Sequence, residues 1–180
     1  PRKDLLELAS STNLTKLEIG TRDSTTQHHT PAQHLKTLNG IECLQNLQVL
    51  KLYGQQDLTN IEHLGACINL TTVDVDLPSN GGSLDCIGRL INLKDLTLDR
   101  LNNVQRLNLE HCDKLENVTL KARGGNLDTN RLGLANLHHL KRLTLFCRHL
   151  ENGNAIPIDQ KSLVKLKIKT QSALQFDESF

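Results

Sequence analysis

Histidines and cysteines are the residues of this sequence whose types could do chemistry, and they are scattered. His28, His29 and His34 form the densest histidine group, inside the polar stretch GTRDSTTQHHTPAQ. A metal site needs three or four ligands in a fixed geometry, and no Cys-x-x-Cys or His-Glu-x-x-His motif accompanies them. Cys147 and His149 are close in sequence, but their surroundings do not indicate an activated thiol. We therefore expect no metal, no cofactor and no enzyme activity.

Two glycine-rich stretches, SNGGS and RGGN, could be considered as phosphate-binding loops. Neither has the spacing Gly-x-x-x-x-Gly-Lys-Ser/Thr that such a loop requires. Glycine more often serves turns that need a positive φ, so we predict a turn at each stretch. Carboxylates that could pair occur only on neighbouring repeats, which favours recognition over catalysis.

The composition limits the classes of partner. The chain has 180 residues, a formal net charge of +1 and only 2% aromatic residues. A charge near zero does not favour a long nucleic acid, and no apolar run reaches the roughly 18 residues of a membrane span. Five scattered cysteines, an odd number, favour reduced thiols and a cytoplasmic location. Because the sequence begins at Pro1 without a methionine, we expect a part of a longer protein.

A hook of the form Leu-x-x-Leu-x-Leu, with Ile or Val allowed, recurs along the whole chain. It starts at Leu14, Leu47, Leu70, Leu93, Val104, Leu115, Leu140 and Leu163. Without Val104, the spacings after Leu47 are 23, 23, 22, 25 and 23 residues. The alternating leucines have a period of two, so each hook is predicted to be a short strand.

Between the hooks, apolar residues recur at every third position. Examples are Leu35, Leu38, Ile41 and Leu44, and then Leu84, Ile87 and Leu90. Residues i and i+3 lie on one face of a 3₁₀ helix, so these segments are predicted to be short helical returns.

The hook at Val104 lies only 11 residues after Leu93. A coil of this kind needs about 20–29 residues to go out along a strand and return. We therefore place Leu93 and Leu115 one coil apart and assign Val104 to the return segment between them.

These motifs resemble leucine-rich repeats. The stretches NLQVLKLYGQQDLTNIEHLGACINL and LINLKDLTL, with their 22–23-residue spacing, are similar to the SDS22-like and plant-type classes. The resemblance covers about residues 5–174. It implies an α/β fold, a right-handed solenoid of about seven coils in a single domain, with a parallel sheet on its concave side and short helical or 3₁₀ segments on its convex side. Gln55 and Arg123 stand where the family usually has asparagine.

One polar insertion, near residues 20–34, interrupts the repeats. The spacing from Leu14 to Leu47 is 33 residues, about ten more than the other spacings. We expect a loop after the first strand, which is either a tolerated insertion or a contact loop.

The residues between the inward leucines of each hook should form columns on the concave sheet. Four carboxylates should gather there in an acidic patch: Asp74, Asp76, Asp95 and Asp99. Five cations should form a basic patch: Arg142, Lys165, Lys167, Lys169 and Lys121. Tyr53 and Phe146 fall on the same face and are predicted to be exposed anchors for a protein partner. Lys51 is the remaining candidate contact.

The sequence thus predicts a protein-interaction module that binds a protein or a peptide, with or without phosphate, on its concave sheet. One host is a ubiquitin-ligase-like or bacterial effector protein, in which the module recognises a substrate. A sensor portion of an intracellular immune receptor and a purely structural spacer are the alternatives. Fold alone gives no activity, and the oligomeric state is open.

Overall fold

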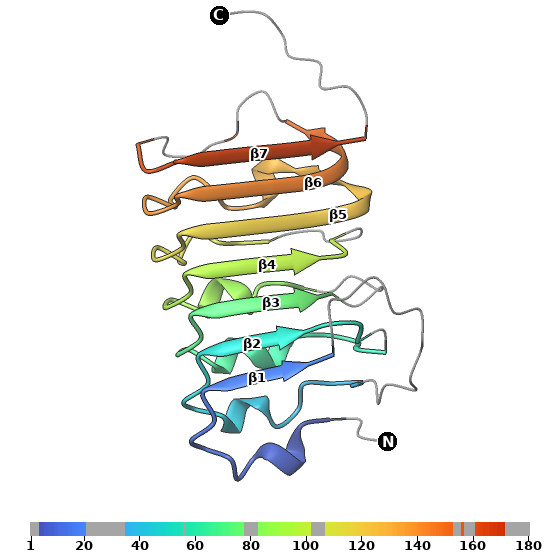
Figure 1. The fold of residues 1–180 in the computed structure, drawn as a ribbon, viewed down its shortest axis with the longest axis vertical. Helices are drawn as coiled ribbons and strands as arrows, with labels where there is room; N and C mark the ends of the chain where they lie inside the picture. Colours follow the sequence, from blue (N-terminus) through green and yellow to red (C-terminus); the bar gives the residue numbers. More distant parts are fainter. Residues whose placement is uncertain are drawn as a thin grey trace, which may run out of the picture.

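Seven parallel strands form one continuous sheet in chain order (Figure 1). The computed structural model describes residues 4–20, 35–55, 57–77, 83–101, 107–152, 156 and 161–171. The strands are β1 (Lys16–Ile19), β2 (Val49–Leu52), β3 (Thr72–Asp76), β4 (Asp95–Asp99), β5 (Asn117–Asp128), β6 (Arg142–Glu151) and β7 (Lys165–Thr170). Each strand belongs to one predicted hook, so the parallel solenoid predicted from the repeat spacing is confirmed.

The register of the sheet settles the position of the hook at Val104. Strand β4 pairs directly with β5, with Asp95 opposite Asn117. Leu93 and Leu115, the first residues of the two hooks, are therefore one coil apart, as predicted. Val104 itself lies outside the described residues, but Leu107 after it is fully buried and belongs to no strand.

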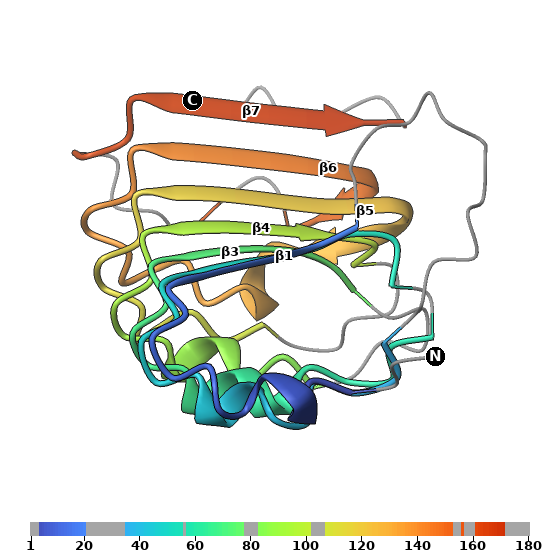
Figure 2. The same cartoon turned by 60° about the horizontal axis from the view of Figure 1, so that its bottom comes forward.

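Short 3₁₀ helices lie on the side of the solenoid opposite the sheet (Figure 2). They are η1 (Leu6–Leu8), η2 (Ile41–Cys43), η3 (Glu62–Ala66), η4 (Ile87–Arg89) and η5 (Thr129–Arg131). Their inward residues, such as Ile41, Leu64 and Ile87, are fully buried. The period-three pattern therefore predicted the 3₁₀ returns correctly, because a 3₁₀ turn places every third side chain on one face.

The core consists of stacked layers of leucine between the sheet and the returns. On β4 the inward residues Leu96 and Leu98 are buried, and they lie beside Val118 and Leu120 of β5. The side chains of a strand alternate between its two faces, so the residues between them point away from the core. This alternation is what brings charged residues from distant segments together on one surface, which we call the sheet face.

Asparagines join successive coils at the N-terminal ends of the strands. Their side-chain amides donate to backbone carbonyls of the preceding coil at 2.8–3.0 Å: Asn46 to Thr12, Asn69 to Gln45, and Asn92 to Ile68. Sequence reasoning did not predict these contacts. The sequence did contain the necessary pattern: an asparagine stands directly before the first leucine of several hooks, so an amide recurs at the same position in each of these coils.

One glycine-rich stretch differs from its prediction, and the other stretch and the polar insertion lie largely outside the described residues. Gly124 lies inside β5, at a register shift between Ala122 and Asn126, so the turn predicted for RGGN is wrong. Most of SNGGS and the histidine-containing loop at 21–34 lie outside the described residues. Within the described part of the chain, no helix is long and apolar enough to cross a membrane.

The stacked layers predict which truncations destabilise the protein. Leu98 is fully buried, so Leu98→Ala should lower the free energy of unfolding by about 2–5 kcal/mol through lost burial and the cavity left behind. Ile91→Ala is the matched control, since this side chain is 53% exposed and should lose no more than about 0.5 kcal/mol. Urea denaturation followed by circular dichroism measures both, and equal losses would contradict the layered core.

Candidate partner-binding sheet face

The register places every predicted contact residue on or beside the sheet face. Asp74 lies opposite Thr97, and Asp76 lies opposite Asp99, so the acidic patch spans β3 and β4. The basic patch spans β5, β6 and β7, with Arg142 opposite Lys165. The two patches are adjacent, as predicted, but they differ in how far their charges are paired within the chain.

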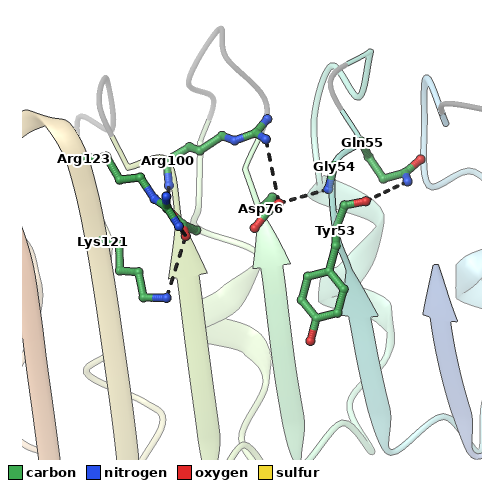
Figure 3. Close-up of polar contacts among 8 residues, drawn as sticks. Tyr53, Gly54, Gln55, Asp76, Arg100, Lys121 and Arg123 are labelled. Atoms are coloured by element: carbon green, nitrogen blue, oxygen red, sulfur yellow. Dashed lines mark hydrogen bonds and ion pairs between the residues drawn. The ribbon is translucent and has the colours of Figure 1, made fainter. Parts of the chain in front are cut away.

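Asp99 is a buried carboxylate at the centre of an ion-pair network, which corrects its predicted exposure. Only 2% of the residue is exposed. Its carboxylate accepts two hydrogen bonds from the Arg123 guanidinium, at 2.9 and 2.7 Å, and one from the Arg100 backbone N–H at 2.8 Å. The ammonium of Lys121 lies 3.7 Å away (Figure 3). The carboxylate is therefore already occupied by its own chain.

Burial by itself raises the pKa of Asp99, because a low-dielectric surrounding disfavours the charged form. The hydrogen bonds from Arg123 and Arg100 and the nearby charges of Arg123 and Lys121 outweigh this effect. The net result is an Asp99 pKa below its ordinary value.

Asp76 is also held by its own chain. It accepts a hydrogen bond from the Gly54 N–H at 2.9 Å, and the Arg100 guanidinium lies 3.8 Å from it. Arg100 has a positive φ of 64°, which is uncommon for a residue with a side chain. Its backbone and side chain thus link Asp99 to Asp76. Sequence reasoning missed Arg100 and Arg123 as partners, although Arg123 follows Asp99 by 24 residues, close to the repeat length.

Tyr53 is buried rather than exposed, so its predicted exposure is wrong. Only 6% of the residue is exposed, and its hydroxyl donates to Asp74 at 2.8 Å. Figure 3 shows the ring beside β2, with the side chain of Gln55 reaching the Tyr53 carbonyl. Gly20 packs so closely that a Cβ there would lie 2.2 Å from this carbonyl oxygen. Tyr53 is a structural part of the face, which a strand pattern alone could not reveal.

Gln55 replaces the asparagine that the repeat pattern usually has. Its side chain is buried and donates to the Tyr53 carbonyl at 3.0 Å, while its oxygen accepts from the Leu35 N–H at 2.9 Å. One amide thus satisfies two backbone groups where the strand ends, which is a structural role.

The lysines of β7 are exposed and have no counter-ion among the residues that the structure describes. Lys165, Lys167 and Lys169 all point outward, and the described part of the chain gives none of them an ion pair or a hydrogen bond. Arg142 is exposed as well and donates to the Asn117 side chain at 3.1 Å. Within the described residues, Arg142 and the three lysines of β7 thus meet no carboxylate, whereas Lys121, the fifth member of the basic patch, is paired with Asp99.

Phe146 is half-buried on the sheet face, in the row that joins Lys121 and Lys169. Lys51, on β2, is half-buried and lies opposite Asp74 of β3. Asp95, on β4, lies opposite Asn117 and bonds to its amide.

The cysteines are buried thiols without disulfides. Cys67, Cys86, Cys112 and Cys147 are all buried, and Cys43 is half-buried. Burial raises the pKa of Cys67 and Cys112 to about 11 and that of Cys86 to about 12, and it also raises the pKa of Cys147. The neutral thiol is thus favoured at all four positions, which does not suit a nucleophile.

Among the described residues, no group of three or more histidine, cysteine or carboxylate side chains could hold a metal ion. His28, His29 and His34, the histidines considered for a metal site, lie outside the described residues.

No protein-family model matches the sequence, and no curated protein matches it. A solved leucine-rich-repeat protein of Leptospira interrogans is 20% identical, with a TM-score of 0.66, over 90% of this chain and 38% of that one. A crystal structure of an internalin from Listeria monocytogenes is 21% identical, with a TM-score of 0.54, over 91% of this chain and 49% of that one.

This chain has the leucine-rich-repeat fold. At about one fifth identity the likeness establishes the fold alone, and the chain spans less than half the length of either structure. The resemblance seen in the sequence is thereby confirmed at the level of fold.

The Asp99 network predicts a pH-dependent stability of this leucine-rich-repeat chain. Asp99→Asn should lower the free energy of unfolding at pH 7 by about 1–3 kcal/mol, because a charged acceptor is lost. The folded pKa lies below the unfolded value of about 3.9, so this contribution exists above that pH and disappears as pH falls through the folded pKa. Urea titrations of both proteins between pH 7 and pH 2 measure the difference.

The exposed Asp113→Asn serves as the control and should change stability little at any of these pH values. A difference between wild type and Asp99→Asn that stays constant down to pH 2 would contradict the network.

The buried thiols predict an order of alkylation. At pH 8, iodoacetamide should modify Cys43 first, because only this cysteine is partly exposed. The four buried thiols should react only as the chain unfolds, since their pKa values are raised. Mass spectrometry of the modified peptides with and without urea gives the order. Fast modification of Cys147 in the folded protein would contradict the buried setting.

Proposed function

We propose that this chain is a protein-recognition module that docks a partner on its sheet face. The observation that carries the proposal is the group of exposed cations on β6 and β7, Arg142, Lys165, Lys167 and Lys169, which lie beside the half-buried Phe146 and meet no carboxylate among the described residues. Aromatic residues and arginine are enriched at protein interfaces, and a patch of one charge steers a partner of the opposite charge toward it. Asp76 and Asp99 are each paired with an arginine of the same chain, which supports the same role, because these contacts hold the surface in one conformation before a partner binds.

The finer proposal concerns the host protein. We propose substrate recognition within a ubiquitin-ligase-like or bacterial effector protein, in a cytoplasmic setting. Five unpaired cysteines agree with a reducing compartment. The module would supply binding while another part of the protein supplies any chemistry, since leucine-rich-repeat folds give no activity by themselves.

Blocking the sheet face tests the proposal without removing a charge. Thr119 and Thr144 lie side by side near the start of β5 and β6, and both are half-buried. The double variant Thr119→Trp/Thr144→Trp should reduce capture of specific partners from a cell extract by at least about tenfold, or about 1.4 kcal/mol. Quantitative mass spectrometry of captured proteins is the measurement.

The matched control places the same bulk on the opposite side. Ala66 and Ala135 are exposed and lie outside the sheet. The double variant Ala66→Trp/Ala135→Trp should capture partners as the wild type does. Partners lost by the control but kept by the sheet-face variant would place binding on the return side. No partner above background for the wild type would favour a structural spacer.

A further inference from the structure

We propose that the basic patch recognises an extended acidic segment of a partner protein, with an apolar side chain of that segment resting on Phe146. The proposal deepens the proposed function and rests on it. It specifies which part of the sheet face makes contact and the chemistry of what it contacts.

The register turns the last three strands into a regular array of outward side chains. Three rows cross β5, β6 and β7: Asn117, Arg142 and Lys165; then Thr119, Thr144 and Lys167; then Lys121, Phe146 and Lys169. Neighbours within a row are about 4.8 Å apart, and successive rows are about 6.6 Å apart. Five of the nine positions are cationic and none is acidic.

Four of these five cations are not neutralised in the way that the acids next to them are; the fifth, Lys121, lies 3.7 Å from the Asp99 carboxylate. Asp99 forms ion pairs with Arg123 and Lys121, and Asp76 forms one with Arg100. Within the described residues, Lys165, Lys167 and Lys169 meet no carboxylate. Like charges at this spacing repel one another, and an anionic ligand would relieve that repulsion.

The spacing of the charges fits an extended peptide. Lys165, Lys167 and Lys169 occupy alternate positions of one strand, so their columns repeat every two residues, about 6.6 Å. The side chains on one face of an extended peptide repeat at the same distance. A segment with an acidic residue at every second position, lying along β7, therefore places one carboxylate near each lysine.

Phe146 supplies the apolar contact beside the charges. Its ring is half-buried, and it stands in the row between Lys121 and Lys169. An apolar residue next to the acidic positions would cover the ring and exclude water from the neighbouring ion pairs, which strengthens them. Thr144, at the centre of the array, offers a hydroxyl as a further hydrogen-bond donor.

The arrangement favours carboxylates on a protein over phosphates or a nucleic acid. Phosphate sites usually bring donors together on one group, through arginine forks or backbone N–H groups. Here four of the five cations are lysines, and each stands at a separate position of the array. A long polyanion running along the rows, from strand to strand, would next meet Asp95, which lies in the row of Asn117 and Arg142.

Synthetic peptides of about ten residues test the proposal by fluorescence anisotropy. The probe alternates Glu with Ser and carries one central Leu. It should bind the wild-type chain saturably, and raising NaCl from about 0.1 M to 1 M should weaken binding, because the Debye length falls from about 10 Å to 3 Å. A probe with Lys in place of Glu should not bind.

The charge-reversal variant Lys165→Glu/Lys167→Glu/Lys169→Glu should weaken binding of the Glu probe by more than about tenfold. The control variant Lys36→Glu/Lys94→Glu/Lys114→Glu changes the net charge equally but lies off the basic patch, and it should bind as the wild type does. Phe146→Ala should weaken the probe with Leu and leave a probe with Ser in its place nearly unchanged. Circular dichroism confirms that each variant is folded.

Three results would overturn the proposal: no saturable binding of the Glu probe, equal loss in the two charge variants, or tighter binding of a phosphoserine peptide or a single-stranded oligonucleotide. Failure of the probes while the tryptophan-blocked face still loses its protein partners would leave the proposed function standing and remove only the acidic ligand. Loss of both would remove the function as well.

Discussion

Each coil of this solenoid buries the inward side chains of its strand against the same positions of the next coil. Leu98 lies beside Leu120, and Leu120 beside Leu145, because the strands are parallel and their registers are fixed. A slip of one residue would turn the whole buried set toward water and the polar set into the core. The leucine layers therefore determine, residue by residue, which side chains stand on the sheet face. Every feature of the candidate site depends on that constraint.

The sheet face divides into two halves that differ in how charge is balanced. In the acidic half, a carboxylate on one strand meets a cation about one repeat later in the chain, as Asp99 meets Arg123. Burying the Asp99 carboxylate is tolerable because the Arg123 guanidinium, whose side chain stays 67% exposed, donates two parallel hydrogen bonds to it. In the basic half, the lysines of β7 remain in water, where their charges are screened and cost little. The first arrangement stabilises a fixed surface, and the second leaves attraction for something outside the chain.

The sequence predicted the fold well because the fold depends on periodicity. Hook spacing gave the strands, the three-residue period gave the 3₁₀ returns, and coil length placed Leu93 and Leu115 in adjacent coils. Exposure on the sheet face was harder to predict. Tyr53 and Asp99 occupy outward positions but are buried, and each is hydrogen-bonded to a side chain of the next coil, Asp74 and Arg123 respectively. Such contacts depend on rotamers and on groups a full coil away, which a period-two pattern does not contain.

Arg123 shows what additional sequence signal could have corrected this error. It stands where the repeat pattern usually has asparagine, and in this chain it continues β5 beyond the ordinary length of a hook. The register shift after Ala122 accompanies that extension. A cation at a position that normally serves the backbone, following Asp99 by 24 residues, indicates an ion pair between coils. The same search for charges one repeat apart can be applied to β7. The charged residue aligned with Lys165 on the preceding strand is Arg142, which is a cation and not a carboxylate. Because no acid stands at the β6 positions aligned with the β7 lysines, these three lysines, unlike Lys121 opposite Asp99, keep their charge available to a partner.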